Sequence, residues 1–300
     1  MVVAEHINKW YRTTQVLNDV CFETAKGEIF GLIGPDGAGK TTLFRVLTTL
    51  IKADSGRATI GGLDAETDYR EIRTRIGYMP GRFSLYPDLT VRENLEFFAT
   101  IFGATVRENY TLIEGIYRSL APFENRPAGK LSGGMKQKLA LSCVLIHKPS
   151  VLFLDEPATG VDPVSRKELW SMLRQLKEQG ITIIVSTPYM DEALLCDRIA
   201  LMQHGKLLSA ATPAQVIAAY PRKLYAAEAP NNYRLLNELR ANPQVASAYA
   251  FGDCVHVAFI AQSDTSIPNL REIPPGIEDC FIELTTGKGA WNDHRKNDGK

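Results

Sequence analysis

The sequence predicts an α/β fold in which helices cover both faces of a mainly parallel β-sheet. Apolar runs at residues 28–33, 151–155 and 181–186 have the length and composition of buried strands. Segments with helical character follow the first run, at 40–50, and separate the other two, at 165–179. Strands that alternate with helices favour a parallel sheet between helical layers.

The N-terminal part predicts strands of a different kind. Residues 15–24 alternate apolar and polar side chains, as an antiparallel strand with one buried face does. A turn at Asp54-Ser55-Gly56 precedes a short strand at 58–60, and residues 76–79 predict another strand. We therefore expect antiparallel pairing for the strand at 15–24.

Helices replace strands between about residues 87 and 147. The segment 88–94 resembles a capped helix start, and Leu95, Phe98, Ala99 and Phe102 follow at helical spacing. This region is predicted to be a helical subdomain.

The pattern changes again after about residue 213. It predicts a strand at 224–229, a helix at 233–240, a hairpin around Gly252-Asp253 and a closing segment at 277–284. The predicted domains are residues 1–215, a small α+β accessory domain at 216–286, and a polar tail or linker at 287–300.

Composition restricts the function classes. The 300 residues carry no formal net charge, which gives no support to nucleic-acid binding, and hydrophobic residues make up 45%, as in soluble globular proteins. No apolar run approaches the roughly 20 residues of a membrane span, and the N-terminus does not resemble a signal peptide. The five cysteines show no metal-ligand spacing and predict reduced thiols in a cytoplasmic protein.

A P-loop pattern lies between the first buried strand and the helix that follows it. Its glycines allow backbone N–H groups to point at phosphate oxygens, and the helix N-terminus adds partial positive charge. Lys40 is expected to bridge the β- and γ-phosphates of ATP, and Thr41 to bind Mg²⁺. The predicted ATP-binding residues of this loop are Gly34, Pro35, Asp36, Gly37, Ala38, Gly39, Lys40, Thr41 and Thr42.

Two acidic residues end the second buried strand. Asp155 is placed to hold Mg²⁺, and Glu156 to polarise the water that attacks the γ-phosphate. Glu156 is therefore the candidate catalytic residue.

A short run precedes this acidic strand and consists of Leu131, Ser132, Gly133, Gly134 and Met135. Together with the P-loop and Asp155-Glu156, it makes residues 2–213 resemble the ATP-binding cassette (ABC) family. The resemblance implies a P-loop NTPase cassette with a core sheet, an antiparallel β subdomain and a helical signature subdomain. It also implies that two cassettes clamp ATP between them.

The resemblance assigns further roles. Tyr11 corresponds to the aromatic residue that stacks on adenine, and the run 131–135 to the signature that contacts ATP held by the opposite cassette. Val161 and Asp162 correspond to the loop that crosses the dimer interface. The second cassette is expected to be a homodimer partner, a heterodimer partner or the other half of a tandem protein.

Several segments resemble one branch, the ATP-binding subunits of ABC-2 type exporters, which include daunorubicin-exporter-like proteins. These segments are residues 76–80, 86–95, 190–193 and 277–284. The branch implies an ATPase that works with an ABC-2 membrane permease on the inner face of the plasma membrane in efflux of drugs or other small molecules. Asp36 and residues 133–139 resemble the first cassette of tandem proteins.

Two positions depart from the family pattern. Gly81 replaces a Gln that reaches Mg²⁺ and the attacking water, and Pro188 replaces a His that contacts the γ-phosphate. Loss of such a group reduces rates by roughly 10²–10³ in other enzymes. Three interpretations stay open: the site binds ATP but hydrolyses it slowly, Glu156 suffices for weak turnover, or a neighbour such as Thr187 or Tyr189 substitutes.

The alternative to transport is a soluble regulatory cassette, or an ABC ATPase that acts on ribosomes or DNA. The neutral charge and the exporter-like segment 277–284 count against the second of these. The transported substrate is not encoded in this chain, because the membrane domain selects it.

Overall fold

A computed structural model describes residues 1–81, 85–260 and 269–286. The chain divides into two compact units, Met1–Thr212 and the residues from Pro213 onward. The predicted tail at 287–300 lies outside the described residues. Within the described ranges, no helix combines the length and apolar character needed to cross a bilayer.

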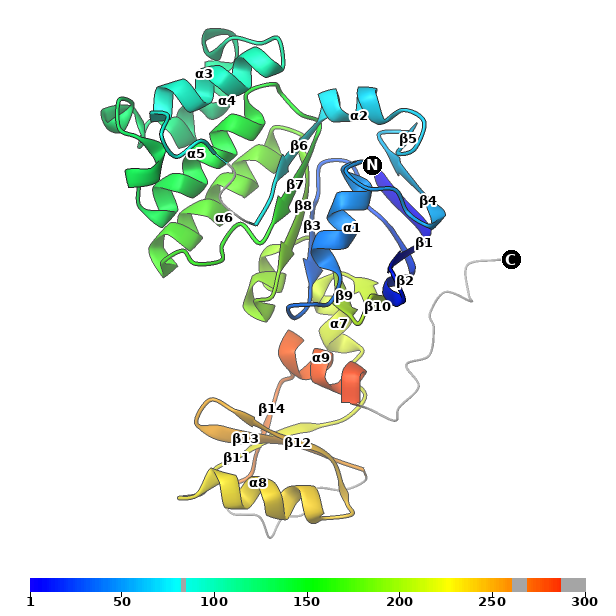
Figure 1. Cartoon of the computed structure of the whole chain (residues 1–300). Helices are drawn as coiled ribbons and strands as arrows, with labels where there is room; N and C mark the ends of the chain where they lie inside the picture. The colour runs from blue at the N-terminus through cyan, green and yellow to red at the C-terminus, as the bar shows by residue number, and fades with distance from the viewer. Residues whose placement is uncertain (82–84, 261–268, 287–300) are drawn as a thin grey trace. The chain divides into compact units, whose positions relative to one another are not determined.

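A six-stranded sheet forms the centre of the first unit, in the order β10-β9-β3-β8-β7-β6. The five strands from β9 to β6 are parallel, and only β10 runs antiparallel to its neighbour. The predicted mainly parallel α/β fold is therefore confirmed (Figure 1). The strands are β3 (Ile29–Ile33), β6 (Ile76–Met79), β7 (Val151–Asp155), β8 (Thr182–Thr187), β9 (Arg198–Gln203) and β10 (Lys206–Ala211).

A second, antiparallel sheet has the order β2-β1-β4-β5 and comprises β1 (Val2–Tyr11), β2 (Thr14–Glu23), β4 (Ser55–Ile60) and β5 (Leu63–Asp64). Helix α1 (Lys40–Leu47) contacts β2 and β4 of this sheet and β7 of the parallel sheet. Apolar side chains of both sheets and of α1, among them Phe30, Phe44 and Phe153, form one buried core. The phosphate loop is thus anchored between two sheets.

The predicted helical region contains α3 (Val91–Ile101), α4 (Val106–Tyr117) and α5 (Gly133–Leu145). Helices α3 and α4 begin with capping boxes, Thr90 with Glu93 and Thr105 with Glu108, which satisfy free N–H groups of the first turn. Helix α5 packs on β6, and α6 (Pro163–Glu178) packs on β3 and β8. The shorter helices of the first unit are α2 (Tyr69–Arg75), η1 (Ala121–Phe123), η2 (Ala128–Lys130) and η3 (Met190–Leu195).

The second unit is a small α+β structure. Its sheet has the order β12-β13-β11-β14, and all described pairings in it are antiparallel. Leu235, Leu236 and Leu239 of one helix pack on Val255 and Val257 of the sheet. The elements are α7 (Pro213–Ala218), β11 (Leu224–Ala227), α8 (Asn232–Ala241), β12 (Val245–Phe251), β13 (Cys254–Phe259), β14 (Arg271–Ile273) and α9 (Ile277–Thr286).

Candidate functional site

The carboxyl ends of four parallel strands meet at one edge of the central sheet. Ile33 of β3 pairs with Thr187 of β8, Asp155 of β7 pairs with Ser186, and Met79 of β6 pairs with Leu154. The residues that follow these strands therefore lie at the same edge. They are the phosphate loop 34–39, Pro188, Glu156 and Gly81.

The phosphate loop is held by close backbone contacts. Gly34 N–H donates to the carbonyl of Thr187 at 3.2 Å, and a Cβ at Gly34 would lie 2.1 Å from the carbonyl oxygen of Met202. Gly39, directly before α1, has φ 106°, which favours glycine. Residues with a Cβ therefore fit neither position without a backbone shift.

Lys40 begins α1 and is almost completely buried, with 3% of its surface exposed. Its Nζ donates to the carbonyls of Gly34 at 2.7 Å and Pro35 at 3.0 Å, and lies 3.2 Å from Oε1 of Glu156. The loop carbonyls and the Glu156 carboxylate thus offset the buried ammonium charge.

Asp155 is a buried carboxylate at the end of β7, with 2% exposure. Its Oδ1 accepts a hydrogen bond from Oγ of Ser186 at 2.6 Å, and no cationic side chain of the described residues pairs with it. Burial raises the pKa of the nearby Tyr78 to about 12, and the charge of Asp155 adds to this shift. A buried carboxylate without a cationic side chain is suited to a hard metal ion such as Mg²⁺.

Glu156 has φ 51°, a left-handed conformation that is uncommon outside glycine. Its N–H lies 3.0 Å from both the carbonyl oxygen and the hydroxyl of Ser186. These contacts hold the backbone in the unusual conformation while the carboxylate faces Lys40.

Gly81 lies against the backbone of the acidic strand. A Cβ built on it would lie 3.0 Å from the carbonyl oxygen of Asp155 and 3.8 Å from Cβ of Glu156. A cavity of about 200 Å³ begins here, and its lining includes Gly133, Gly160 and Val161. The structure therefore brings Gly81, the start of α5 and the loop before α6 to one cavity.

The segment after β8 is held in part by Arg166, a residue that the sequence analysis did not single out. Tyr189 N–H donates to Oγ1 of Thr187 at 3.1 Å, and the guanidinium of Arg166 lies 4.3 Å from the Tyr189 ring centre. Arg166 Nε is 3.6 Å from Oε1 of Glu192, a residue with 1% exposure. Arg166 on α6 thus holds the segment that contains Pro188, a contact that no local sequence pattern signals.

The signature run forms the N-terminus of α5. Ser132 is the N-cap of this helix and accepts from Met135 N–H at 3.4 Å, while Ser132 and Gly133 are exposed. A Cβ at Gly134 would lie 2.4 Å from Oγ of Ser165, so only glycine fits this packing of α5 on α6.

Asp162 and Tyr11 occupy the ends of other elements. Asp162 is the N-cap of α6 and accepts from the N–H groups of Val164 and Ser165 at 3.1 and 3.0 Å. Tyr11 ends β1 with 43% of its surface exposed, which leaves its ring open to a ligand.

Comparison with known proteins identifies this arrangement. The family model described as ABC transporter matches residues 17–159. A Nod factor export ATP-binding protein I from Burkholderia orbicola is 34% identical over 290 residues, which cover 93% of this chain and 95% of that protein. The chain belongs to the ABC transporter family.

Two further proteins extend the comparison of this ABC cassette. The probable multidrug ABC transporter ATP-binding protein YbhF of Escherichia coli is 41% identical over 279 residues, which cover 88% of this chain and 48% of the relative. The chain thus spans about half the length of that protein. A dimeric ATP-binding cassette, in a post-hydrolysis state with bound ADP and Pi, matches with 25% identity and a TM-score of 0.64 over 71% of this chain and 98% of that one.

Proposed function

We propose that this chain is the ATP-binding and ATP-hydrolysing part of an ABC-2 type exporter, and that it acts with a second cassette and a membrane permease. The observation that carries the proposal is the convergence of the phosphate loop, Asp155, Glu156 and Pro188 at one edge of the parallel sheet. Relatives named for multidrug transport and Nod factor export support the export role.

The phosphates of ATP would replace the contacts that Lys40 makes in this structure. Its ammonium already lies at the N-terminus of α1, where backbone N–H groups and the helix dipole favour an anion. The hydroxyl of Thr41 and the carboxylate of Asp155 would hold Mg²⁺, which neutralises phosphate charge when bound. Movement of Lys40 to the phosphates would free Glu156 to accept a proton from water.

We further propose that hydrolysis in this cassette's own site is attenuated. Gly81 and Pro188 flank the catalytic strand and offer no side-chain donor, and Pro also lacks an N–H group. The exposed Ser132 and Gly133 would instead complete the nucleotide site of the partner cassette.

The experiment mixes this chain with its partner cassette and the permease, and measures ATP turnover and transport in proteoliposomes. Ser132→Arg here should abolish turnover, because a large cation blocks close approach to the partner's ATP, whereas Glu156→Gln should change it little. Loss of turnover in Glu156→Gln would refute attenuation. Nucleotide-dependent ribosome binding without permease-dependent transport would support the alternative of a non-transport ATPase.

The proposed permease contact is an exposed aromatic pair, with Tyr86 before α3 and Phe97 within it. Tyr86 and Phe97 are 48% and 37% exposed, and their ring centres are 4.8 Å apart. The neighbouring Leu85 is buried, and Phe83 lies outside the described residues. Tyr86→Ala with Phe97→Ala should weaken permease binding and leave ATP binding unchanged, whereas Tyr233→Ala serves as an exposed aromatic control in the second unit.

A further inference from the structure

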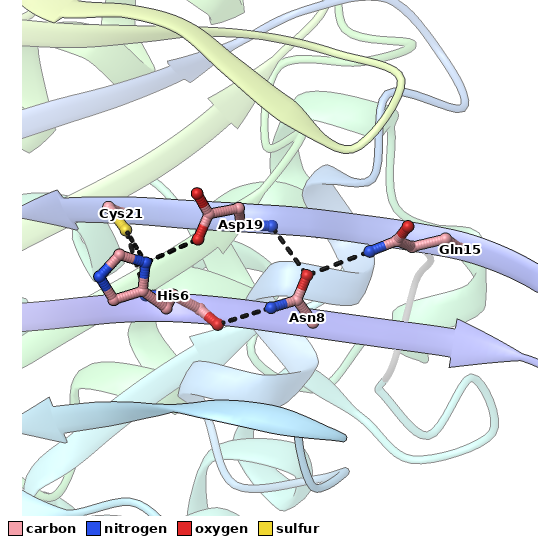
Figure 2. A network of polar contacts seen from close by, with 5 residues as sticks. All are labelled: His6, Asn8, Gln15, Asp19 and Cys21. Atoms are coloured by element: carbon pink, nitrogen blue, oxygen red, sulfur yellow. Dashed lines mark hydrogen bonds and ion pairs between the residues drawn. The ribbon is translucent and has the colours of Figure 1, made fainter.

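Three potential metal ligands face one another on the antiparallel sheet, outside the nucleotide site. His6 lies on β1, and Asp19 and Cys21 lie on the paired strand β2 (Figure 2). Each residue offers one ligand atom: an imidazole nitrogen, a carboxylate oxygen or the thiol sulfur. These three atoms lie within 4.8 Å of one another.

The separations are close to those of a coordination site. Cys21 Sγ is 3.5 Å from His6 Nδ1. Two ligands at about 2.3 Å (sulfur) and about 2.0 Å (nitrogen) from a tetrahedral zinc ion are also roughly 3.5 Å apart. Asp19 Oδ1, now 2.6 Å from Nδ1, needs to move outward by less than about 1 Å, and its 65% exposure leaves room for that shift.

The backbone that carries these ligands is held in an unusual form. His6 has φ 52° and Asp19 has φ 55°, both in the left-handed region that disfavours residues with a Cβ. Asn8 bridges the two: its Nδ2 donates to the carbonyl of His6 at 2.8 Å, and its Oδ1 accepts from Asp19 N–H at 2.9 Å. Gln15 Nε2 donates to the same Oδ1 at 3.0 Å and fixes the Asn8 amide.

The sulfur already accepts a backbone hydrogen bond. His6 N–H donates to Cys21 Sγ at 3.1 Å, a contact that holds the sulfur beside the imidazole. An exposed His–Asp pair alone contributes little in water and explains neither the strained positions nor the thiol. Ligands held by outer hydrogen bonds are instead typical of metal sites.

We propose that His6, Asp19 and Cys21 bind a divalent transition-metal ion of the zinc type, with water at the fourth position. The ligands are Nδ1, a carboxylate oxygen and Sγ, and binding releases the thiol proton to solvent. The mixed nitrogen, oxygen and sulfur set selects against Mg²⁺, so the site is distinct in chemistry from the nucleotide site.

The test titrates the full chain, purified without an affinity tag, with Co²⁺ and records its absorption spectrum. We expect a thiolate-to-cobalt charge-transfer band and tetrahedral d–d bands at one equivalent, both removed by Zn²⁺. Cys21→Ser should abolish the charge-transfer band, and His6→Ala should weaken binding at least about tenfold. The matched control is Cys254→Ser, which removes another partly exposed thiol from the second unit.

A second variant tests whether Asn8 holds the ligands in position without binding the metal itself. Asn8→Ala removes no ligand, and should weaken Co²⁺ binding roughly 10-fold or more while the charge-transfer band persists at saturation. Stabilisation of each variant by ATP, measured as a rise in Tm, verifies its fold. The proposal is wrong if the wild-type chain gives no charge-transfer band, or if the band survives in Cys21→Ser.

Discussion

Gly81 lies beside Glu156, the proposed catalytic residue, and offers it no side chain. A Cβ at this position would lie 3.8 Å from Cβ of Glu156, and Gly81 also lines the cavity beside the start of α5. Pro188 removes a donor on the other side of β7. Gly81 and Pro188 follow the two strands that pair with β7, on either side of Glu156, so the effects of changing them should be coupled rather than additive.

Restoring both donors should raise hydrolysis. We expect Gly81→Gln with Pro188→His to increase kcat by roughly 10²-fold in the assembled cassette pair, because both new groups can stabilise transition-state charge. Gly81→Ala is the control: it introduces the same Cβ, 3.0 Å from the Asp155 carbonyl, without a donor. An unchanged kcat in the double variant, with ATP binding intact, would show that another group already supplies this function.

The buried carboxylate of Glu192 should make the stability of the folded protein depend on pH. Burial raises the pKa of Glu192 above its ordinary value, and contacts with Thr187, Trp170 and Arg166 oppose only part of this shift. The folded state therefore holds the proton more tightly than the unfolded state, so the free energy of unfolding falls as pH rises from about 4.5 through the raised pKa.

Glu192→Gln should remove this slope, which urea titrations across that pH range can measure. Asp191→Asn is the matched control, because Asp191 also lies near Arg166 but is 75% exposed. An identical slope in wild type and Glu192→Gln would contradict the assignment.

At the scale of elements, helix α6 links the loop at the proposed dimer interface to the segment that follows β8. Asp162 caps this helix, and the N–H of Ser165 in particular lowers the pKa of its carboxyl. Four residues on, Arg166 contacts Tyr189 and Glu192. A single helix thus connects the loop assigned to the interface with the segment beside the phosphate loop.

Two substitutions separate these roles. Asp162→Ala removes the cap and should lower Tm by about 2–4 °C, the usual effect of a lost N-cap in a unit of this size. Asp162→Asn retains a good cap and should keep Tm, but should lower ATP turnover of the cassette pair if the carboxylate acts across the interface. Unchanged turnover in Asp162→Asn would limit Asp162 to its structural role.

At the scale of the molecule, every candidate nucleotide-site residue belongs to the unit Met1–Thr212. The second unit has its own apolar core between α8 and its sheet. Each unit therefore contains the packing that independent folding requires.

A fragment that ends at Thr212 should unfold cooperatively and bind ATP with the Kd of the full chain. Thermal unfolding with and without ATP measures this, and Lys40→Ala in the same fragment should lose the ATP-dependent rise in Tm. A fragment that aggregates, or that binds ATP at least about tenfold more weakly, would show that the second unit stabilises the first.

The sequence by itself predicted a mainly parallel core, its buried strands β3, β7 and β8, and the family, but neither β9 nor the order of the strands in the sheet. Continuous apolar runs, the P-loop and the signature each lie within a short stretch of sequence. They can therefore be recognised without knowledge of contacts between distant residues. It did not predict β1, because the register shifts around Ala4–Lys9 and the left-handed His6 interrupt the alternation that marks a strand.

Only the tertiary structure decided which distant residues meet. The pairing of β3, β8, β7 and β6 brings four separate loops to one edge, and α6 packing places Arg166 beside Tyr189. The cysteines showed no ligand spacing because His6 and Cys21 meet only through the pairing of β1 with β2. Such contacts depend on strand register and helix packing, which act between segments far apart in the chain and leave no local pattern in it.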